Sequence, residues 1–154
     1  MKRRLFCWAW LLPWAVSAQA PTEAWTQALR PELGLPKWPA LKHWQTHPRL
    51  SHTGLRLEME HIADNGNSVP LRLCCEALPA QEHLRQLHLI SERNPRPEIF
   101  KLEFLQPLNT LDLSTRIRLA GTQNLIALAE TNQGRVLWVS HHISVTDSAC
   151  VEGA

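Results

Sequence analysis

The sequence lacks the short motifs that mark the common catalytic sites. It contains no G-x-S-x-G nucleophile elbow, no H-E-x-x-H zinc motif, no glycine-rich phosphate loop and no C-x-x-C pair. The motifs of this chain therefore do not indicate any of four common enzyme classes: serine hydrolases, zinc proteases, nucleotide-binding enzymes and thioredoxin-like oxidoreductases.

The sequence also has little net charge. Without Lys2, Arg3 and Arg4, 13 of its 16 basic residues remain against 14 acidic ones, for a net charge of −1. This balance leaves no electrostatic footprint for nucleic acid, and no run of like charge indicates a membrane-surface patch. With 154 residues, of which 44% are hydrophobic and 19% are charged, the chain fits one soluble domain that buries its own core.

The first twenty residues are typical of a cleavable export signal. Lys2-Arg3-Arg4 is a positively charged start, Leu5 to Val16 is apolar, and small residues follow. The apolar run is shorter than the roughly 20 residues that a membrane-spanning helix needs. Cleavage after Ala18 and after Ala20 both fit, and Arg3-Arg4-Leu5-Phe6 also resembles a twin-arginine signal, so the export route stays open. We expect a periplasmic protein without a membrane span after cleavage.

Removal of the signal leaves three cysteines, which are Cys74, Cys75 and Cys150. An odd number in an oxidising compartment indicates an intermolecular bond or a free thiol. The adjacent Cys74 and Cys75 should point to opposite faces of one strand, so a bridge between them would be strained. Cys75 shares the apolar face of that strand with Leu71 and Leu73, and we expect it in the core. Cys150 is the candidate for reactive chemistry.

Two short helices are predicted near the start of the mature chain. Thr22 can cap a helix whose apolar face includes Trp25 and Leu29, and Pro31 ends it. A second short helix is predicted from Pro39 to about Gln45. We therefore expect an N-terminal helical segment over residues 21–50, after the signal at 1–20.

From residue 55 onward, apolar residues alternate with polar ones, which predicts β-strands. The seven predicted strands cover about 55–60, 68–76, 85–91, 100–104, 111–119, 125–129 and 136–145. Pro70 indicates an edge position or the first residues of its strand, and the continuous apolar run at 125–129 indicates a central strand. The predicted fold is an all-β, immunoglobulin-like sandwich over residues 51–146, followed by a flexible arm at 147–154.

The histidines and two arginines are the candidates for binding a metal ion or an anion. His43 and His47 have the spacing of metal ligands on a helix but lack an obvious third ligand, and the adjacent His141 and His142 should face opposite ways. We expect no metal site and no catalytic residue. Arg116 and Arg118 share one strand face, which is either a solvated face or a contact for an anion or a partner.

The C-terminal segment places a thiol among small residues. Ser148 and Ala149 precede Cys150, and an extended chain could hold this thiol some 10–14 Å from the sheet, enough to enter a cleft of another protein. The thiolate is the reactive form of cysteine. Because Glu152 should raise the pKa of this thiol by like-charge repulsion, a partner enzyme would have to supply an activating positive charge.

Several ordered pieces of the sequence resemble SoxY, the sulfur-carrying subunit of the SoxYZ complex in bacterial thiosulfate oxidation. The matching pieces are Ile62-Ala63-Asp64-Asn65-Gly66 with Val69-Pro70, Asn94-Pro95-Arg96-Pro97, Ser114-Thr115-Arg116-Ile117-Arg118-Leu119, Ala127-Leu128-Ala129-Glu130 and the C-terminal Cys150. SoxY proper ends in Gly-Gly-Cys-Gly-Gly. The arm here, Ser148-Ala149-Cys150-Val151-Glu152, is similar to that of a SoxY-related group reading Ala-Ala-Cys-Ile-Glu.

The resemblance implies a covalent carrier and not an enzyme. In the family, a c-type cytochrome joins thiosulfate to the arm cysteine, and other enzymes hydrolyse the sulfone and oxidise the remaining sulfane. Mapped onto this chain, Cys150 would be the attachment point, the partner would be a SoxZ-like subunit in a heterodimer, and no cofactor would be needed beyond the sulfur adduct itself. Val151 and Glu152 stiffen and widen the arm relative to the glycine-flanked form, so neither the cargo nor the client enzymes follow from the resemblance.

Two other functions remain compatible with the sequence. The chain could be an immunoglobulin-like binding or assembly module whose tail cysteine forms an intermolecular disulfide. It could also be a small periplasmic enzyme with Cys150 as nucleophile, although the sequence offers no obvious base to activate it.

Overall fold

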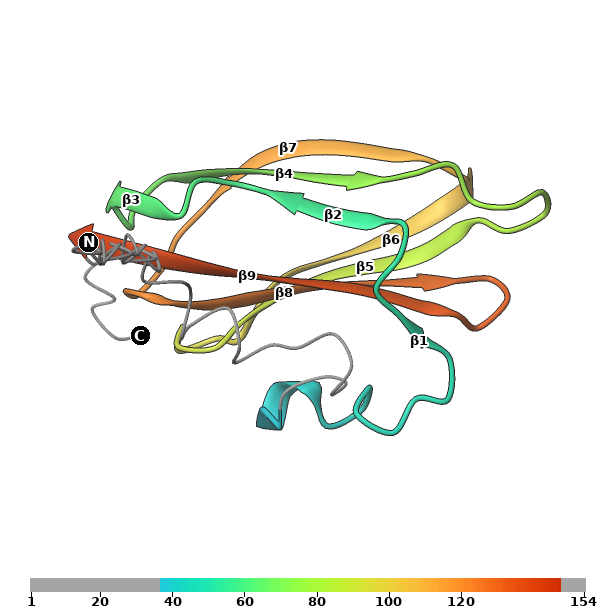
Figure 1. The fold of residues 1–154 in the computed structure, drawn as a ribbon, viewed down its shortest axis with the longest axis horizontal. Helices are drawn as coiled ribbons and strands as arrows, with labels where there is room; N and C mark the ends of the chain where they lie inside the picture. The colour runs from blue at the N-terminus through green and yellow to red at the C-terminus, as the bar shows by residue number, and fades with distance from the viewer. Residues whose placement is uncertain (1–36, 148–154) are drawn as a thin grey trace, which may run out of the picture.

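Two β-sheets pack face to face in the computed structural model, which describes residues 37–147 (Figure 1). The larger sheet has the spatial order β1 (Leu50–Ser51), β9 (Val136–Asp147), β8 (Gln123–Thr131), β5 (Leu84–Ser91) and β6 (Glu98–Leu108), and β3 (Ile62–Asn65) also pairs with β9. The smaller sheet has the order β2 (Leu55–Glu58), β4 (Val69–Cys75) and β7 (Leu111–Ile117). The predicted all-β sandwich is confirmed.

Some of the predicted features lie outside the described residues. These are the export signal at 1–20, the first predicted helix near Thr22, and the arm residues 148–154 with Cys150. Within residues 37–147, no helix is long or apolar enough to cross a membrane.

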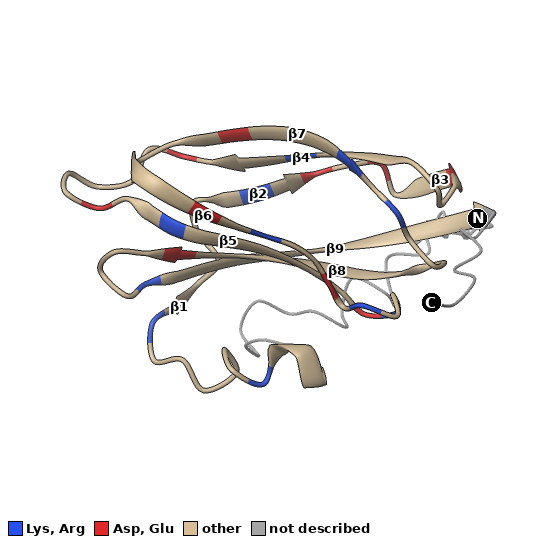
Figure 2. Cartoon of the chain, turned by 180° about the vertical axis from the view of Figure 1, so that it is seen from behind, with Lys and Arg blue, Asp and Glu red and all other residues tan. Residues whose placement is uncertain are grey.

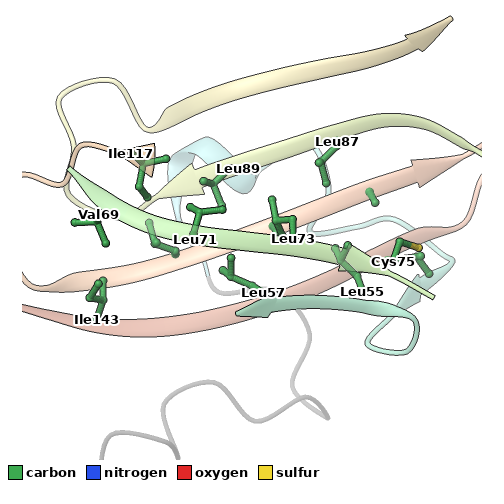
Figure 3. Close-up of a cluster of buried hydrophobic side chains, with 14 of the residues drawn as sticks. Leu55, Leu57, Val69, Leu71, Leu73, Cys75, Leu87, Leu89, Ile117 and Ile143 are labelled. Carbon is green, nitrogen blue, oxygen red and sulfur yellow. The ribbon is translucent and has the colours of Figure 1, made fainter. Parts of the chain in front are cut away.

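The main core fills the space between the two sheets (Figure 3). Alternate residues of β4 point into it, including Val69, Leu71 and Leu73, which are at most 4% exposed. The larger sheet contributes Leu87 and Leu89 from β5, together with inward residues of β8 and β9. Because each buried leucine contributes roughly 1.5–3 kcal/mol, this alternation fixes the register of the strands against any one-residue slip.

A second apolar cluster covers the outer face of the larger sheet. Leu41 and Trp44, from the segment that precedes β1, pack against outward residues of the sheet such as Ile126 and Trp138. Trp44 also donates a hydrogen bond from Nε1 to Glu130 Oε1 at 2.9 Å. Since β8 is thus covered on both faces, its run from 125 to 129 is apolar without alternation, and its predicted central position is confirmed.

The predicted helix from Pro39 to Gln45 is wrong. The segment instead forms a three-residue 3₁₀-helix, η3 (Pro39–Leu41), followed by turns. Its successive hydrogen bonds link Leu41 N to Trp38 O, Trp44 N to Leu41 O and His47 N to Trp44 O, each three residues apart. Trp38, Leu41 and Trp44 all pack in the apolar cluster over the larger sheet, and their spacing of three residues matches a 3₁₀-helix better than an α-helix with 3.6 residues per turn.

Residues 37–147 form nine strands where the sequence predicted seven. The two additional strands, β1 and β3, are short and pair in parallel with β9. Asp64 and Asn65 lie between two of the predicted strands but belong to β3, and the turn follows at residues 66–67. β4 is the central strand of its sheet, yet its pairing with β2 covers only Arg72 to Cys75, so Pro70 lies on a stretch of β4 that β2 leaves open.

Candidate functional site

The residue predicted to carry the chemistry, Cys150, follows the last residue of β9 by three positions. Its predicted flanks Ser148, Ala149, Val151 and Glu152 likewise lie beyond the described residues. What the structure defines is the base from which this segment extends. We call this region the β9 end: the last residues of β9, the β3–β4 turn at 66–68, the β5–β6 connector at 92–97 and the β7–β8 connector at 118–122.

The final residues of β9 are held on both sides. β8 pairs with β9 from Val136 up to Ile143, and β3 pairs in parallel with Ser144, Val145 and Asp147. This second pairing exists because β2 stops at Glu58 and the chain then crosses from the smaller sheet to the larger one. The backbone is therefore fixed as far as Asp147, and a chain of three residues can place Cys150 at most about 10–11 Å beyond it.

Threonine hydroxyls add hydrogen bonds to this fixation. Val145 N donates to Thr122 Oγ1 at 2.9 Å, and Thr146 Oγ1 donates to the carbonyl oxygen of Asp64 at 2.9 Å. β9 is thus tied to the β7–β8 connector on one side and to β3 on the other. These anchors could not be predicted, because a lone threonine in a strand pattern carries no signal of its hydrogen-bond partner.

Asn94 joins two connectors of the β9 end. Its Nδ2 donates to the carbonyl oxygen of Arg118 at 2.9 Å, and its Oδ1 accepts from Ala120 N at 2.9 Å and from Gln123 Nε2 at 3.0 Å. Gln123 is only 1% exposed, so this amide has no access to water as a replacement partner. In the Asn94-Pro95-Arg96-Pro97 piece, the first residue therefore stabilises the fold by joining two connectors.

The two described cysteines are both buried and free of disulfides. Cys75 is 4% exposed in the main core, as predicted, and burial raises the pKa of its thiol. Cys74 lies on the opposite face, 8% exposed, with its Sγ 4.0 Å from Asp112 Oδ1. Neither is placed as an accessible nucleophile, because both side chains are buried.

The histidines are dispersed over the structure. His141 stacks on His61, whereas its neighbour His142 contacts Asn124 Oδ1 through Nδ1 at 3.0 Å. Among residues 37–147, no group of three or more His, Cys, Asp or Glu side chains is arranged to hold a metal ion. Arg116 and Arg118 are both exposed, and Arg116 reaches the carbonyl and hydroxyl oxygens of Ser68 at 3.4 Å.

Comparison with known proteins gives one family and one informative fold match. The family described as "Sulfur oxidation protein SoxY" matches residues 42–150, a span that ends on Cys150. The structure of the sulfur carrier protein SoxY from Chlorobium limicola f thiosulfatophilum superposes with a TM-score of 0.56 at 20% identity, covering 68% of this chain and 86% of that one.

Superoxide reductases superpose less well. Neelaredoxin from Ignicoccus hospitalis gives a TM-score of 0.48 at 15% identity, covering 60% of this chain and 80% of that one. A putative superoxide reductase from Thermotoga maritima gives 0.47 at 15% identity, covering 63% and 86%. No curated protein matches the sequence.

Proposed function

The chain belongs to the SoxY family of sulfur oxidation proteins, and on that basis we propose that it is a covalent sulfur carrier whose Cys150 holds intermediates while other enzymes act on them. The observation that carries this proposal is that the family match extends through Cys150, three residues after a strand that is anchored up to Asp147. A strand fixed up to Asp147, followed by a short segment that carries the thiol, suits a cysteine that must enter another protein. The chain itself acts as the bearer of substrate and not as a catalyst.

Thiosulfate is the proposed cargo. Joining it to Cys150 forms a sulfur–sulfur bond, releases one proton from the thiol and removes two electrons, which a c-type cytochrome would accept one at a time. The product is a cysteine S-thiosulfonate. Hydrolysis by a second enzyme would then consume one water, release sulfate and two protons, and leave a persulfide on Cys150.

The proposed setting is the periplasm, and the proposed partner is a SoxZ-like subunit in a heterodimer. The export signal predicted at residues 1–20 supports the location, and membership of the SoxY family supports a partner from the Sox system. Val151 and Glu152 beside the sulfur select client enzymes whose clefts admit a bulkier arm than the glycine-flanked form.

Intact-mass spectrometry of protein purified without reductant tests the proposal. After incubation with thiosulfate and the client cytochrome, the wild-type chain should gain a reductant-sensitive adduct that Cys150→Ser abolishes. Cys74→Ser is the matched control and should keep the adduct, because Cys74 is buried. The proposal fails if the thiol of Cys150 stays unmodified. A dimer that depends on Cys150 and forms without any sulfur adduct would instead support the assembly-module function.

A further inference from the structure

Four arginines gather at the β9 end. All are exposed, and none forms an ion pair within residues 37–147, whereas Arg56, Arg72 and Arg135 all pair with carboxylates. Two lie on the β5–β6 connector, one in β7 and one directly after β7. We call them the arginine rim: Arg93, Arg96, Arg116 and Arg118.

Hydrogen bonds fix the first half of the arginine rim next to the base of the arm. Arg93 donates from its guanidinium to the carbonyl oxygen of Thr122 at 3.1 Å, and the hydroxyl of Thr122 accepts from Val145 N at 2.9 Å. Thr122 therefore bridges Arg93 to Val145, which lies two positions before the end of β9. Arg118 joins the same connectors, because its carbonyl oxygen accepts from Asn94.

The second half of the arginine rim lies toward the β3–β4 turn. Arg116 contacts Ser68 in that turn, and Leu119 N donates to the carbonyl oxygen of Gly66 at 2.8 Å. Figure 2 shows Lys and Arg segments in blue on β7 and on the connectors at the end where β9 terminates. Cationic side chains thus occur on elements of both sheets around the end of β9.

The acidic residues of the same region do not neutralise these guanidinium groups by direct contact. Glu92 accepts from Asn124 N and Nδ2 at 3.1 and 2.8 Å, and Glu98 pairs with His88 at 2.7 Å. Asp64 is exposed in β3 and lowers the local positive charge. Arg93 and Arg116 each use one guanidinium nitrogen in a hydrogen bond to a backbone oxygen. Their other N–H groups, and those of Arg96 and Arg118, can donate to carboxylates of another molecule.

We propose that the arginine rim is a docking surface for an acidic protein surface that surrounds the cleft of a client enzyme. This inference rests on the proposed carrier function. Because three residues can carry Cys150 at most about 10–11 Å beyond Asp147, the mouth of any cleft that Cys150 enters must approach the β9 end. Two of the four arginines lie on the β5–β6 connector and two lie at the end of β7. This spread over elements of both sheets fits an extended acidic surface better than a single small anion.

Exposed charges at such an interface act mainly on the rate of encounter and on its salt dependence. A deca-glutamate peptide is a suitable probe of acidic surface chemistry, with binding measured on the full chain by anisotropy of a labelled peptide. Arg96→Gln with Arg118→Gln should weaken binding about three- to tenfold at low salt, and added salt should remove most of the difference. The control pair Arg56→Gln with Arg85→Gln, at the other end of the sandwich, should leave binding unchanged.

Equal weakening in the control pair would overturn the proposal, because it would show attraction to any exposed arginine. Saturable binding of thiosulfate that is lost in the rim variant, without binding of the peptide, would instead assign a small-anion site. Thermal unfolding of each variant checks that the fold is intact. Cys150→Ser separates the carrier proposal from the docking proposal, because this variant should keep peptide binding and lose the sulfur adduct. Each proposal can therefore be contradicted without the other.

Discussion

The imidazole rings of His61 and His141 stack, with ring centroids 4.7 Å apart and planes inclined by 10°. The contact joins the residue before β3 to the middle of β9, next to the hydrogen bond from Ser144 N to the carbonyl oxygen of His61 at 2.8 Å. His141 Nε2 also lies 3.4 Å from the carbonyl oxygen of Glu60. Burial lowers the pKa of His141, and the neighbouring His61 and His142 lower it further.

A loss of stability in mild acid follows from this pKa. Because the folded state takes up the His141 proton less readily than the unfolded chain, the free energy of unfolding falls once the pH drops below the ordinary histidine value of 6.5. The fall continues until the pH reaches the lowered pKa of the folded state. Urea unfolding at a series of pH values should show it, and His141→Gln should flatten the curve. The control His83→Gln should leave the curve unchanged; if it flattens the curve equally, His141 is not the cause.

Removal of Arg135 should destabilise the fold. Arg135 donates from Nε and from Nη2 to the two carboxylate oxygens of Glu82, both at 3.0 Å, and the Glu82 side chain is 4% exposed. Arg135→Gln leaves that buried carboxylate without its cation and should cost about 2–4 kcal/mol in the free energy of unfolding. Arg135→Gln combined with Glu82→Gln should recover part of this loss. A single variant as stable as the wild type would contradict the assignment.

Asn94→Ala should loosen the β9 end. The variant removes three hydrogen bonds and leaves the buried Gln123 amide without one partner, at a cost of about 2–3 kcal/mol. Amide hydrogen exchange should accelerate in the connector at 118–122 and in the last residues of β9. Asn109→Ala, at an exposed position in the β6–β7 turn, is the control and should change neither measurement.

The buried cysteines should differ in their tolerance of serine. Cys75→Ser places a hydroxyl in the main core and should cost about 1–3 kcal/mol. Cys74→Ser should cost less than about 1 kcal/mol, because its hydroxyl can donate to the nearby Asp112 carboxylate. Under native conditions, neither cysteine should react with iodoacetamide. Rapid labelling of Cys75 in the folded protein would show that the core opens there.

The sequence predicted those parts of the fold that burial dictates. Alternation located β4 and β7, and the unbroken apolar run at 125–129 marked β8 as central. The sequence Asn132-Gln133-Gly134, which is rich in turn-forming residues, lies between β8 and β9. Gly134 indeed adopts a positive φ of 71°, which other residues rarely accept. Each of these signals depends on near neighbours in the chain.

The features that escaped prediction depend on distant residues. β3 forms only because β9 offers a free edge there, and its most exposed apolar residue, Ile62, is 59% exposed and gives no burial signal. The segment at 39–45 has the composition of a helix, but the larger sheet selects a spacing of three residues. The strand pattern indicated Arg116 and Arg118 as a candidate contact for an anion or a partner, but their association with Arg93 and Arg96, up to 25 positions away in the chain, has no local signal.

The position of β9 between β1, β3 and β8 has a consequence for the time at which the protein folds. Leu50 pairs with Val136 and Ile62 with Ser144, so the larger sheet needs contacts that span more than half of the chain. Such non-local pairing places sandwich folds in the millisecond-to-second range, about a thousandfold or more slower than helical bundles. During synthesis, the sheet cannot close before the last strand has left the ribosome. Cys150, the proposed attachment point for sulfur, follows β9 in the chain and is therefore synthesised after this strand.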